Sequence, residues 1–311
     1  MTENKELVIE TSGLGRRFGS LTAVDNLDLK VPQGNVFGFL GRNGAGKTTT
    51  IRLLLGLIRP DAGRVRLFGT EAGHDRIALL GRIGALVETP SLYSHLSGRE
   101  NLEVTRRLRG LKPSCIDRSL QTVGLEAAAG RRVGGYSLGM KQRLALGLSL
   151  LGEPELLILD EPTNGLDPAG IREIRHFIRS LPREHGITVF LSSHLLNEVE
   201  QVADSIAIIR LGCLLFQGPL AELQARRKGH IHVRVDNLEK ALRLIRGLGH
   251  EHAACGKDGA IVVPASGDRE AARINFRLVG DGVCVYGLKS VQPSLEDLFL
   301  SLTDEAQGGR P

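Results

Sequence analysis

A short run of glycines, a lysine and two threonines has the composition and spacing of a loop that binds phosphate groups. The run consists of Gly41, Arg42, Asn43, Gly44, Ala45, Gly46, Lys47, Thr48 and Thr49, and it fits the pattern G-x-x-x-x-G-K-[ST]. Glycines let a backbone wrap closely around phosphate oxygens, with its N–H groups pointing inward. Lys47 is expected to reach the β- and γ-phosphates of a nucleotide, and Thr48 to ligate Mg²⁺.

The neighbouring sequence supplies the context that this pattern requires. An apolar run at residues 36–40 predicts a buried strand, and a helical pattern follows at residues 47–57. The loop would thus join the end of a strand to the start of a helix, whose N-terminus adds positive potential. The alternative, a glycine-rich turn with an exposed lysine, is disfavoured because the context matches at both ends.

Two adjacent carboxylates, Asp160 and Glu161, follow a second apolar run, the Leu-Leu-Ile-Leu of residues 156–159. A charge at the tip of a buried strand is costly unless it is paired or bound to a cation. Asp160 is suited to hold Mg²⁺, and Glu161 to orient and deprotonate an attacking water. Two acids alone would more often be a solvated strand end. A phosphate loop in the same chain favours the catalytic interpretation.

Composition limits the other classes of protein. The chain has 311 residues, of which 41% are hydrophobic and 24% charged, and its net charge of +5 is mild for a globular protein. Aromatic residues make up only 4%, so a base-stacking nucleic-acid surface is not expected. The four cysteines form no C-x-x-C motif, which argues against a zinc or redox site and suits a reducing cytoplasm. Neither a signal peptide nor a run of about 18 apolar residues is found, so we expect no membrane crossing by this chain alone.

The order of the predicted elements indicates a large α/β domain over residues 7–219. Strands that alternate with helices imply βαβ units and a largely parallel sheet. A helical subdomain is predicted at about residues 96–152. The other predicted elements of this domain are strands at residues 7–11, 26–31, 64–68, 156–159, 187–191 and 205–209 and helices at residues 168–181 and 195–203.

A second, smaller α/β domain is predicted at residues 220–303, after the Gly218-Pro219 punctuation. The predicted elements are strands at residues 230–235, 260–263 and 283–286 and helices at residues 237–248, 267–278 and 294–302. Residues 304–311 are expected to be a frayed tail.

Three further motifs, taken with the phosphate loop and the carboxylate pair, make residues 7–218 resemble an ATP-binding-cassette (ABC) ATPase. Residues 136–143, Tyr-Ser-Leu-Gly-Met-Lys-Gln-Arg, resemble the family's signature, in which Ser137 and Gly139 match. Residues 164–167, Asn-Gly-Leu-Asp, resemble its D-loop, and Ser-Ser-His at residues 192–194 resembles its switch histidine. The resemblance implies a P-loop NTPase fold.

The resemblance also implies how two such chains bind ATP with Mg²⁺. Two cassettes pair head to tail, so that each ATP lies between one chain's phosphate loop and the Ser137 and Gly139 of the other. His194 contacts the γ-phosphate, and Asp167 bridges to the partner. Asp167 also suits an N-cap before Pro168. Phe18 stands where the family carries an aromatic that stacks on adenine, although a core phenylalanine is the alternative.

Leu138 and Met140 depart from the Gly and Gln that are common in the family's signature, and a further departure matters more. The Q-loop glutamine is expected within residues 83–90, where this chain has Glu88. A glutamate can ligate Mg²⁺, but when ionised it cannot donate a hydrogen bond. Glu88, the signature and residues 93–101 together resemble the ATPases of bacitracin-resistance and lantibiotic-immunity exporters. The Ser-Leu-Glu-Asp-Leu-Phe-Leu of residues 294–300 is similar to the ending of many drug-exporter ATPases.

We therefore expect an ATPase that drives an exporter of an antibiotic, peptide or other drug-like substrate. It would work at the cytoplasmic face of the membrane with a second copy of itself and a separate permease, and without nucleic acid. Two alternatives are a soluble ABC ATPase not coupled to transport and an importer ATPase with a regulatory C-terminal domain. Soluble members usually carry two cassettes or a long coiled coil, which this chain lacks.

Overall fold

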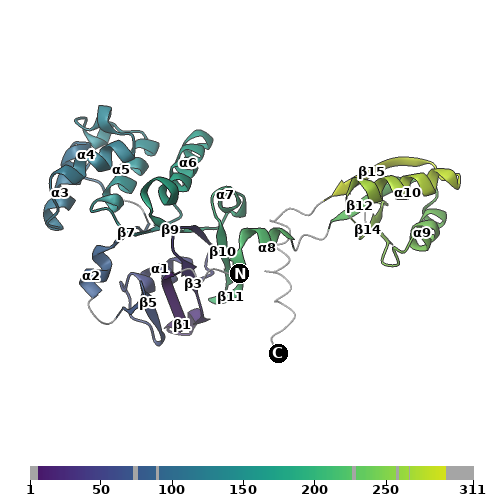
Figure 1. Cartoon of the computed structure of the whole chain (residues 1–311), viewed down its shortest axis with the longest axis horizontal. Coiled ribbons are helices and arrows are strands. Elements are labelled where there is room, and N and C mark those ends of the chain that lie inside the picture. Colours follow the sequence, from purple (N-terminus) through teal and green to yellow (C-terminus); the bar gives the residue numbers. More distant parts are fainter. Residues whose placement is uncertain are drawn as a thin grey trace. The chain divides into compact units, whose positions relative to one another are not determined.

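The computed structural model describes residues 6–72, 76–88, 91–225, 229–256, 259–265 and 267–291. The chain divides into two compact units, Met1–Leu220 and Ala221–Pro311 (Figure 1). The predicted helix at residues 294–302 and the predicted tail at residues 304–311 lie outside the described residues.

The first unit is built on a six-stranded sheet. Its order is β11 (Cys213–Pro219), β10 (Ser205–Arg210), β4 (Val36–Leu40), β9 (Thr188–Ser193), β8 (Leu156–Asp160) and β7 (Ile83–Leu86). All neighbouring pairs are parallel except β10 with β11. The apolar runs of β4 and β8 are buried at every position, as expected for strands covered on both faces. The carboxyl ends of β4, β8 and β9 therefore meet at one edge of the sheet.

A second, antiparallel sheet covers the first and makes the unit more than a single parallel sheet. Its order is β2 (Leu21–Leu27), β1 (Leu7–Phe18), β5 (Ala62–Leu67) and β6 (Thr70–Glu71), with β3 (Lys30–Pro32) also paired to β1. The strand predicted at residues 26–31 is found, but it is interrupted at residues 28 and 29, which separate β2 from β3; both strands pair antiparallel with β1. Asn26 takes a left-handed φ of 47° just before the interruption, where the Asp28 carboxylate accepts a hydrogen bond from the Gly13 N–H.

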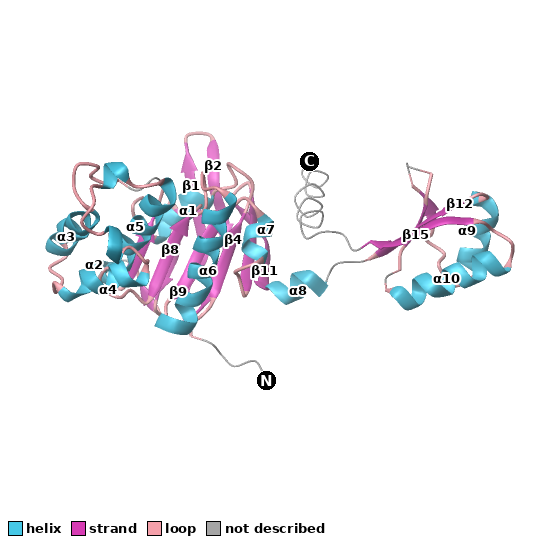
Figure 2. Cartoon of the chain, turned by 90° about the horizontal axis from the view of Figure 1, so that it is seen from above, coloured by secondary structure: helices cyan, strands magenta, loops and turns pink. Residues whose placement is uncertain are grey.

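The helix after the phosphate loop, α1 (Lys47–Leu54), ends earlier than the predicted residue 57, because Gly56 turns the chain with a φ of 59°. Its apolar side chains join those of both sheets in one core cluster, including Ile51, Leu54, Phe37 and Leu14. Three more helices complete this part of the unit: α2 (Arg76–Gly81), α6 (Pro168–His185) and α7 (Leu196–Glu200). Figure 2 shows α6 lying over the sheet beside β9 and β4.

The predicted helical middle is confirmed as α3 (Gly98–Leu108), α4 (Ser114–Thr122) and α5 (Leu138–Leu150), with 3₁₀ turns at Glu126–Ala128 and Val133–Gly135. Figure 1 shows the three helices gathered on one side of the unit. α3 begins with a capping box, in which the Ser97 hydroxyl and the Glu100 carboxylate accept each other's backbone N–H. α5 packs directly on β7, the edge strand of the parallel sheet.

The second unit begins within α8 (Leu220–Ala225). Its further elements are β12 (His230–Val235), α9 (Leu238–Gly247), β13 (Ala254–Cys255), β14 (Ile261–Val263), α10 (Asp268–Gly280) and β15 (Val285–Val291). Its sheet is antiparallel, in the order β13-β14-β12-β15. This βαββαβ arrangement is ferredoxin-like. Alternate residues of β12, Ile231 and Val233, bury against Ile245, Ile274 and Leu278 of the two helices.

Gly84 of β7 lets α5 approach the sheet closely, since a Cβ atom there would lie 2.0 Å from the Ser149 carbonyl oxygen. Because that oxygen belongs to helix backbone, Gly84→Ala should force α5 outward and lower the free energy of unfolding by about 1–3 kcal/mol. Gly81→Ala is the control, because no atom lies within 4 Å of its added methyl group. Urea unfolding of the two variants is the measurement, and equal stability would contradict the packing argument.

Candidate active site

The phosphate loop is shaped by close backbone packing at its second half. Gly46 caps α1 with a φ of 104°, and a Cβ atom there would lie 2.3 Å from the Ala23 carbonyl oxygen of β2. Gly44 also takes a positive φ, of 81°. Both conformations favour glycine over other residues. The first turn of α1 has backbone N–H groups without helical partners, as any helix start does, so the loop can offer donors to phosphate oxygens.

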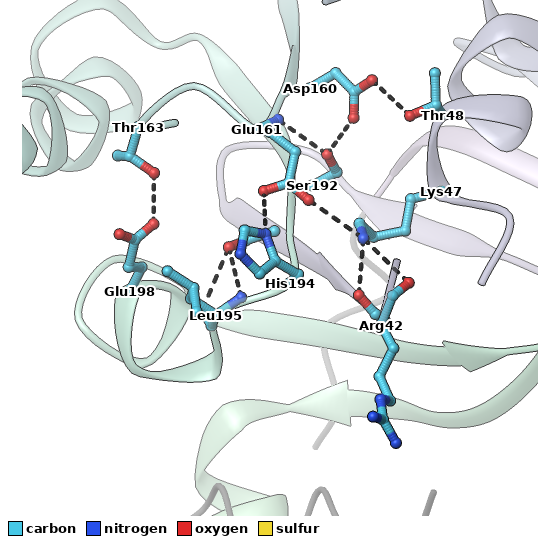
Figure 3. A network of polar contacts seen from close by, with 12 residues as sticks. Arg42, Lys47, Thr48, Asp160, Glu161, Thr163, Ser192, His194, Leu195 and Glu198 are labelled. Carbon is cyan, nitrogen blue, oxygen red and sulfur yellow. Dashed lines mark hydrogen bonds and ion pairs between the residues drawn. The ribbon is translucent and has the colours of Figure 1, made fainter. Parts of the chain in front are cut away.

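Lys47 is the buried cation of the loop, with 6% of its surface exposed. Its Nζ donates to the Gly41 carbonyl at 2.7 Å and to the Arg42 carbonyl at 3.4 Å. It also lies 3.2 Å from the Glu161 Oε1 atom (Figure 3). The first residue of α1 and the carboxylate that follows β8, far apart in sequence, thus form one ion pair.

Asp160 joins the loop to two neighbouring strands. Its Oδ2 atom accepts a hydrogen bond from the Thr48 hydroxyl at 2.8 Å, and its Oδ1 atom accepts one from the Ser192 hydroxyl of β9. Thr48 and Asp160 therefore offer hard oxygen ligands side by side, which fits Mg²⁺. Mg²⁺ is usually held by one or two protein ligands together with water and substrate phosphates, so this small ligand set is sufficient.

Glu161 sits at a strained turn and contacts both charged partners of the site. Its φ is 49°, and its N–H is held by the Ser192 hydroxyl at 3.1 Å and the Ser192 carbonyl at 3.3 Å. Its Oε2 atom lies 2.8 Å from the His194 Nδ1 atom. Non-glycine residues keep such conformations where the surroundings impose them. Here the backbone strain aims one carboxylate between Lys47 and His194.

The roles of Thr163, Glu198 and Ser192 around this cluster were not predicted from the sequence. The Thr163 hydroxyl, two residues after Glu161, donates to the Glu198 carboxylate of α7. Both residues are buried, with 8% and 9% of their surfaces exposed. Ser192 was part of the switch-histidine motif, but only the register of β8 with β9 shows that it supports Asp160. A glutamate within an apolar helical pattern was the available signal for Glu198.

Ser137, Gly139 and Asp167 lie outside the Lys47–Glu161–His194 contacts, since no hydrogen bond or ion pair among the described residues links them to that cluster. The Ser137 hydroxyl caps α5 by accepting from the Met140 N–H at 3.2 Å. Asp167 caps α6 by accepting from the Gly170 N–H at 2.8 Å, so the N-cap prediction is confirmed. The signature helix does reach the carboxylate loop at one point, where the Gln142 side-chain amide donates to the Pro162 carbonyl at 2.6 Å.

Just before the signature, Tyr136 anchors the turn that leads into α5. Its hydroxyl donates to the Ala128 carbonyl at 2.6 Å, and burial raises the pKa of that hydroxyl. Phe18, at the end of β1, is partly open to solvent, with 45% of its surface exposed. This exposure does not fit a core phenylalanine.

Glu88 follows β7 at the same edge of the sheet, but its carboxylate pairs with Arg52 of α1. The side chain is 59% exposed, and its φ is 61°. Among the described residues, no polar contact joins it to Thr48 or Asp160. The structure therefore brings together the predicted site residues Lys47, Thr48, Asp160, Glu161 and His194. Glu88 is joined to this group only indirectly, by its ion pair with Arg52 of α1.

Comparison with known proteins agrees with this geometry. The family model described as ABC transporter matches residues 24–164. The bacitracin transport ATP-binding protein BcrA of Bacillus licheniformis is 43% identical over 95% of this chain and 97% of its own length. The chain belongs to the ABC transporter ATPases. Members of this family hydrolyse ATP, and they generally use it with Mg²⁺.

Other ABC proteins match a large part of the chain. The lantibiotic transport ATP-binding protein SrtF of Streptococcus pyogenes is 40% identical over 68% of this chain and 90% of its own length. A solved ATP-binding subunit of an ABC transporter is 27% identical, with a TM-score of 0.62, over 70% of this chain and 92% of its own. The ABC ATPase fold expected for the first unit is therefore confirmed. Within the part of the chain that is described, no helix is both long and apolar enough to cross a membrane.

The buried Thr163–Glu198 hydrogen bond should contribute to the stability of this ABC ATPase. Thr163→Val removes the donor and leaves a buried carboxylate unsatisfied, which should lower the free energy of unfolding by about 1–3 kcal/mol. Thr163→Ser keeps the hydroxyl and should cost less. The two variants can be compared by urea unfolding, and a valine variant as stable as the serine variant would show that the bond adds nothing.

Proposed function

We propose that this chain is the ATP-hydrolysing motor subunit of an exporter for an antibiotic, peptide or other drug-like substrate. The observation that carries the catalytic part is the convergence of Lys47, Glu161 and His194 beside the Thr48–Asp160 pair. The transport part is supported by relatives named for bacitracin and lantibiotic transport.

The residue roles follow from the charges and distances of the site. Lys47 and the loop N–H groups neutralise and orient the β- and γ-phosphates. Glu161 accepts a proton from the attacking water, since its carboxylate stands between Lys47 and the switch histidine. The hydrogen bond at Nδ1 fixes the His194 ring, so that Nε2 is the nitrogen that faces the γ-phosphate. Mg²⁺ held by Thr48 and Asp160 would supply further neutralisation of the phosphate charge.

The site is completed by a second copy of the chain. Ser137 and Gly139 stand at the start of α5, where a helix N-terminus favours an anion. In a head-to-tail pair they would contact the γ-phosphate bound to the partner, and Asp167 would lie at the dimer interface. Binding of two ATP molecules would then close the pair, and hydrolysis would reopen it.

A separate membrane permease is the proposed transport partner, which would hold the chain at the cytoplasmic face of the membrane. A cavity of about 390 Å³ opens where β7, α3 and α5 meet, and Val87 and Ser91 of the Glu88 loop line it. A cytoplasmic segment of the permease bound in this cavity would lie next to both Glu88 and the signature helix. Movement of the permease would thereby be sensed at the nucleotide site.

The exporter function is tested in cells. Deletion of the gene should lower the resistance to, or raise the accumulation of, a bacitracin-like or lantibiotic-like peptide, and the wild-type gene should restore it. A copy encoding Glu161→Gln, expressed at the same level, should fail to do so. Unchanged resistance together with ATP-dependent uptake of a substrate would instead support an importer. Purification without any membrane protein would support a soluble ATPase.

Glu161→Gln should bind ATP but hydrolyse it at least about 100-fold more slowly, because an amide keeps the shape and cannot accept the proton of the water. The variant should also accumulate as a nucleotide-bound pair, which size-exclusion chromatography with ATP would detect. Phosphate release by the purified complex is the measurement. Near-normal turnover would remove Glu161 from the catalytic role.

Glu88 is predicted to couple the nucleotide site to the permease and to serve as a Mg²⁺ ligand, which would require it to leave Arg52. Glu88→Gln keeps a carbonyl oxygen and should retain partial ATPase activity and transport, whereas Glu88→Ala should lose much more of both. Arg52→Ala frees the carboxylate without removing it, so it separates the ligand role from the ion pair. Wild-type behaviour of Glu88→Ala in coupled ATPase and resistance assays would show that the residue is a solvated glutamate without a role.

A further inference from the structure

The partly exposed ring of Phe18 is backed by a fixed arginine. The Arg16 guanidinium carbon lies 4.9 Å from the centroid of the Phe18 ring, within the range of a cation–π contact. The ring is nonetheless 45% exposed. One face of the phenylalanine is therefore covered by a planar cation, and part of the ring remains open.

Arg16 is held in this position by contacts that do not involve the ring. Its Nη1 atom donates to the Asp61 Oδ1 atom at 2.7 Å and to the Arg59 carbonyl at 3.1 Å. Asp61 is itself fixed by the backbone of β1, since its Oδ2 atom accepts from the Arg17 N–H at 2.7 Å and its N–H donates to the Gly15 carbonyl at 2.9 Å. The guanidinium plane is thus set by the fold.

Stability alone does not account for this arrangement. The side chains of Arg16 and Asp61 are 26% and 44% exposed, and ion pairs this open to solvent typically contribute about 0–1 kcal/mol. The Arg16 Nε atom is buried without a hydrogen-bond partner among the described residues, which is an unfavourable feature. A costly, rigid cation behind an open aromatic face is the kind of feature found at binding sites.

The β1–β2 hairpin that carries Phe18 is packed against the phosphate loop. Phe18 pairs with Leu21 at the hairpin end, and the register slips by one residue at Ala23. The Ala23 carbonyl approaches Gly46 so closely that a side chain at position 46 would collide with it. The Asp25 N–H and the Ala45 carbonyl both bond to Gly212, which fastens the strand to the loop a second time.

We propose that Arg16 is a positioning residue for the nucleobase, and that Arg16, Phe18 and Asp61 form one platform on which the base stacks. The inference rests on the proposed contact of Phe18 with adenine. Arg16 holds the ring in the orientation that the base requires, so less side-chain freedom is lost on binding. Aromatic stacking accepts any purine face, so the platform strengthens binding of the base without adding contacts to the phosphates.

The test compares a ligand that has a base with one that lacks it. Isothermal titration calorimetry of the full chain would measure the Kd for MgATP and for magnesium tripolyphosphate. Arg16→Ala should weaken MgATP binding about 3- to 10-fold and leave tripolyphosphate binding unchanged. Arg16→Lys keeps the charge but not the planar fork, so it should restore little of the loss. Arg17→Ala, which removes a neighbouring exposed arginine side chain, is the matched control and should behave as wild type.

The outcomes separate this inference from the proposed adenine contact. If Phe18→Ala weakens MgATP binding and Arg16→Ala does not, the platform is wrong and the adenine contact stands. If neither variant changes the Kd for MgATP, the adenine contact itself is wrong. An equal loss of tripolyphosphate binding in Arg16→Ala would show that Arg16 acts on the phosphates or on the fold, and would also overturn the proposal. An unchanged thermal unfolding midpoint would confirm that the variants are folded.

Discussion

The buried carboxylate of Asp160 is the constraint on which the rest of the nucleotide site depends. It is 6% exposed and cannot be left without partners in an apolar sheet. The hydroxyls of Thr48 and Ser192 satisfy it, one from the phosphate loop and one from β9. Ser192 in turn holds the N–H of Glu161, which places the next carboxylate between Lys47 and His194. The need to satisfy one charge therefore aligns three chain segments, and the reactive groups occupy positions that this alignment dictates.

Much of the first unit could be predicted because its signals are local. The conformations of β4, β8 and the glycine-lysine-threonine loop can be predicted from their own residues. The parallel sheet could be predicted because strands alternate with helices along the chain. The interruption between β2 and β3 could not be predicted, since the Asp28 carboxylate there accepts a hydrogen bond from the distant Gly13 N–H of β1. The Thr163–Glu198 bond and the Glu88–Arg52 pair were also missed, because each partner lies on a different element and only the packed fold brings them together.

The second unit shows the same limit at the level of topology. Its strands and helices were found approximately, but their periodicity does not say whether neighbours run parallel or antiparallel. The ferredoxin-like order arises because β12 pairs with both β14 and β15, so that Ile231 and Val233 meet the helices on one face. The comparison with BcrA extends over this unit, whereas the match with SrtF covers 68% of the chain.

The hydrogen bond from Gln142 to the Pro162 carbonyl has a mechanical consequence. It joins the signature helix to Pro162, the residue directly after Glu161. The next residue, Thr163, is joined by its hydroxyl to Glu198 of α7, the helix after His194. In the proposed head-to-tail pair, the signature helix touches the nucleotide of one site while Glu161 and His194 serve the other. A shift of α5 would then displace Glu161, the general base, and His194 of its own chain. Hydrolysis at one site would thereby change the geometry of the other site without any contact between the two nucleotides.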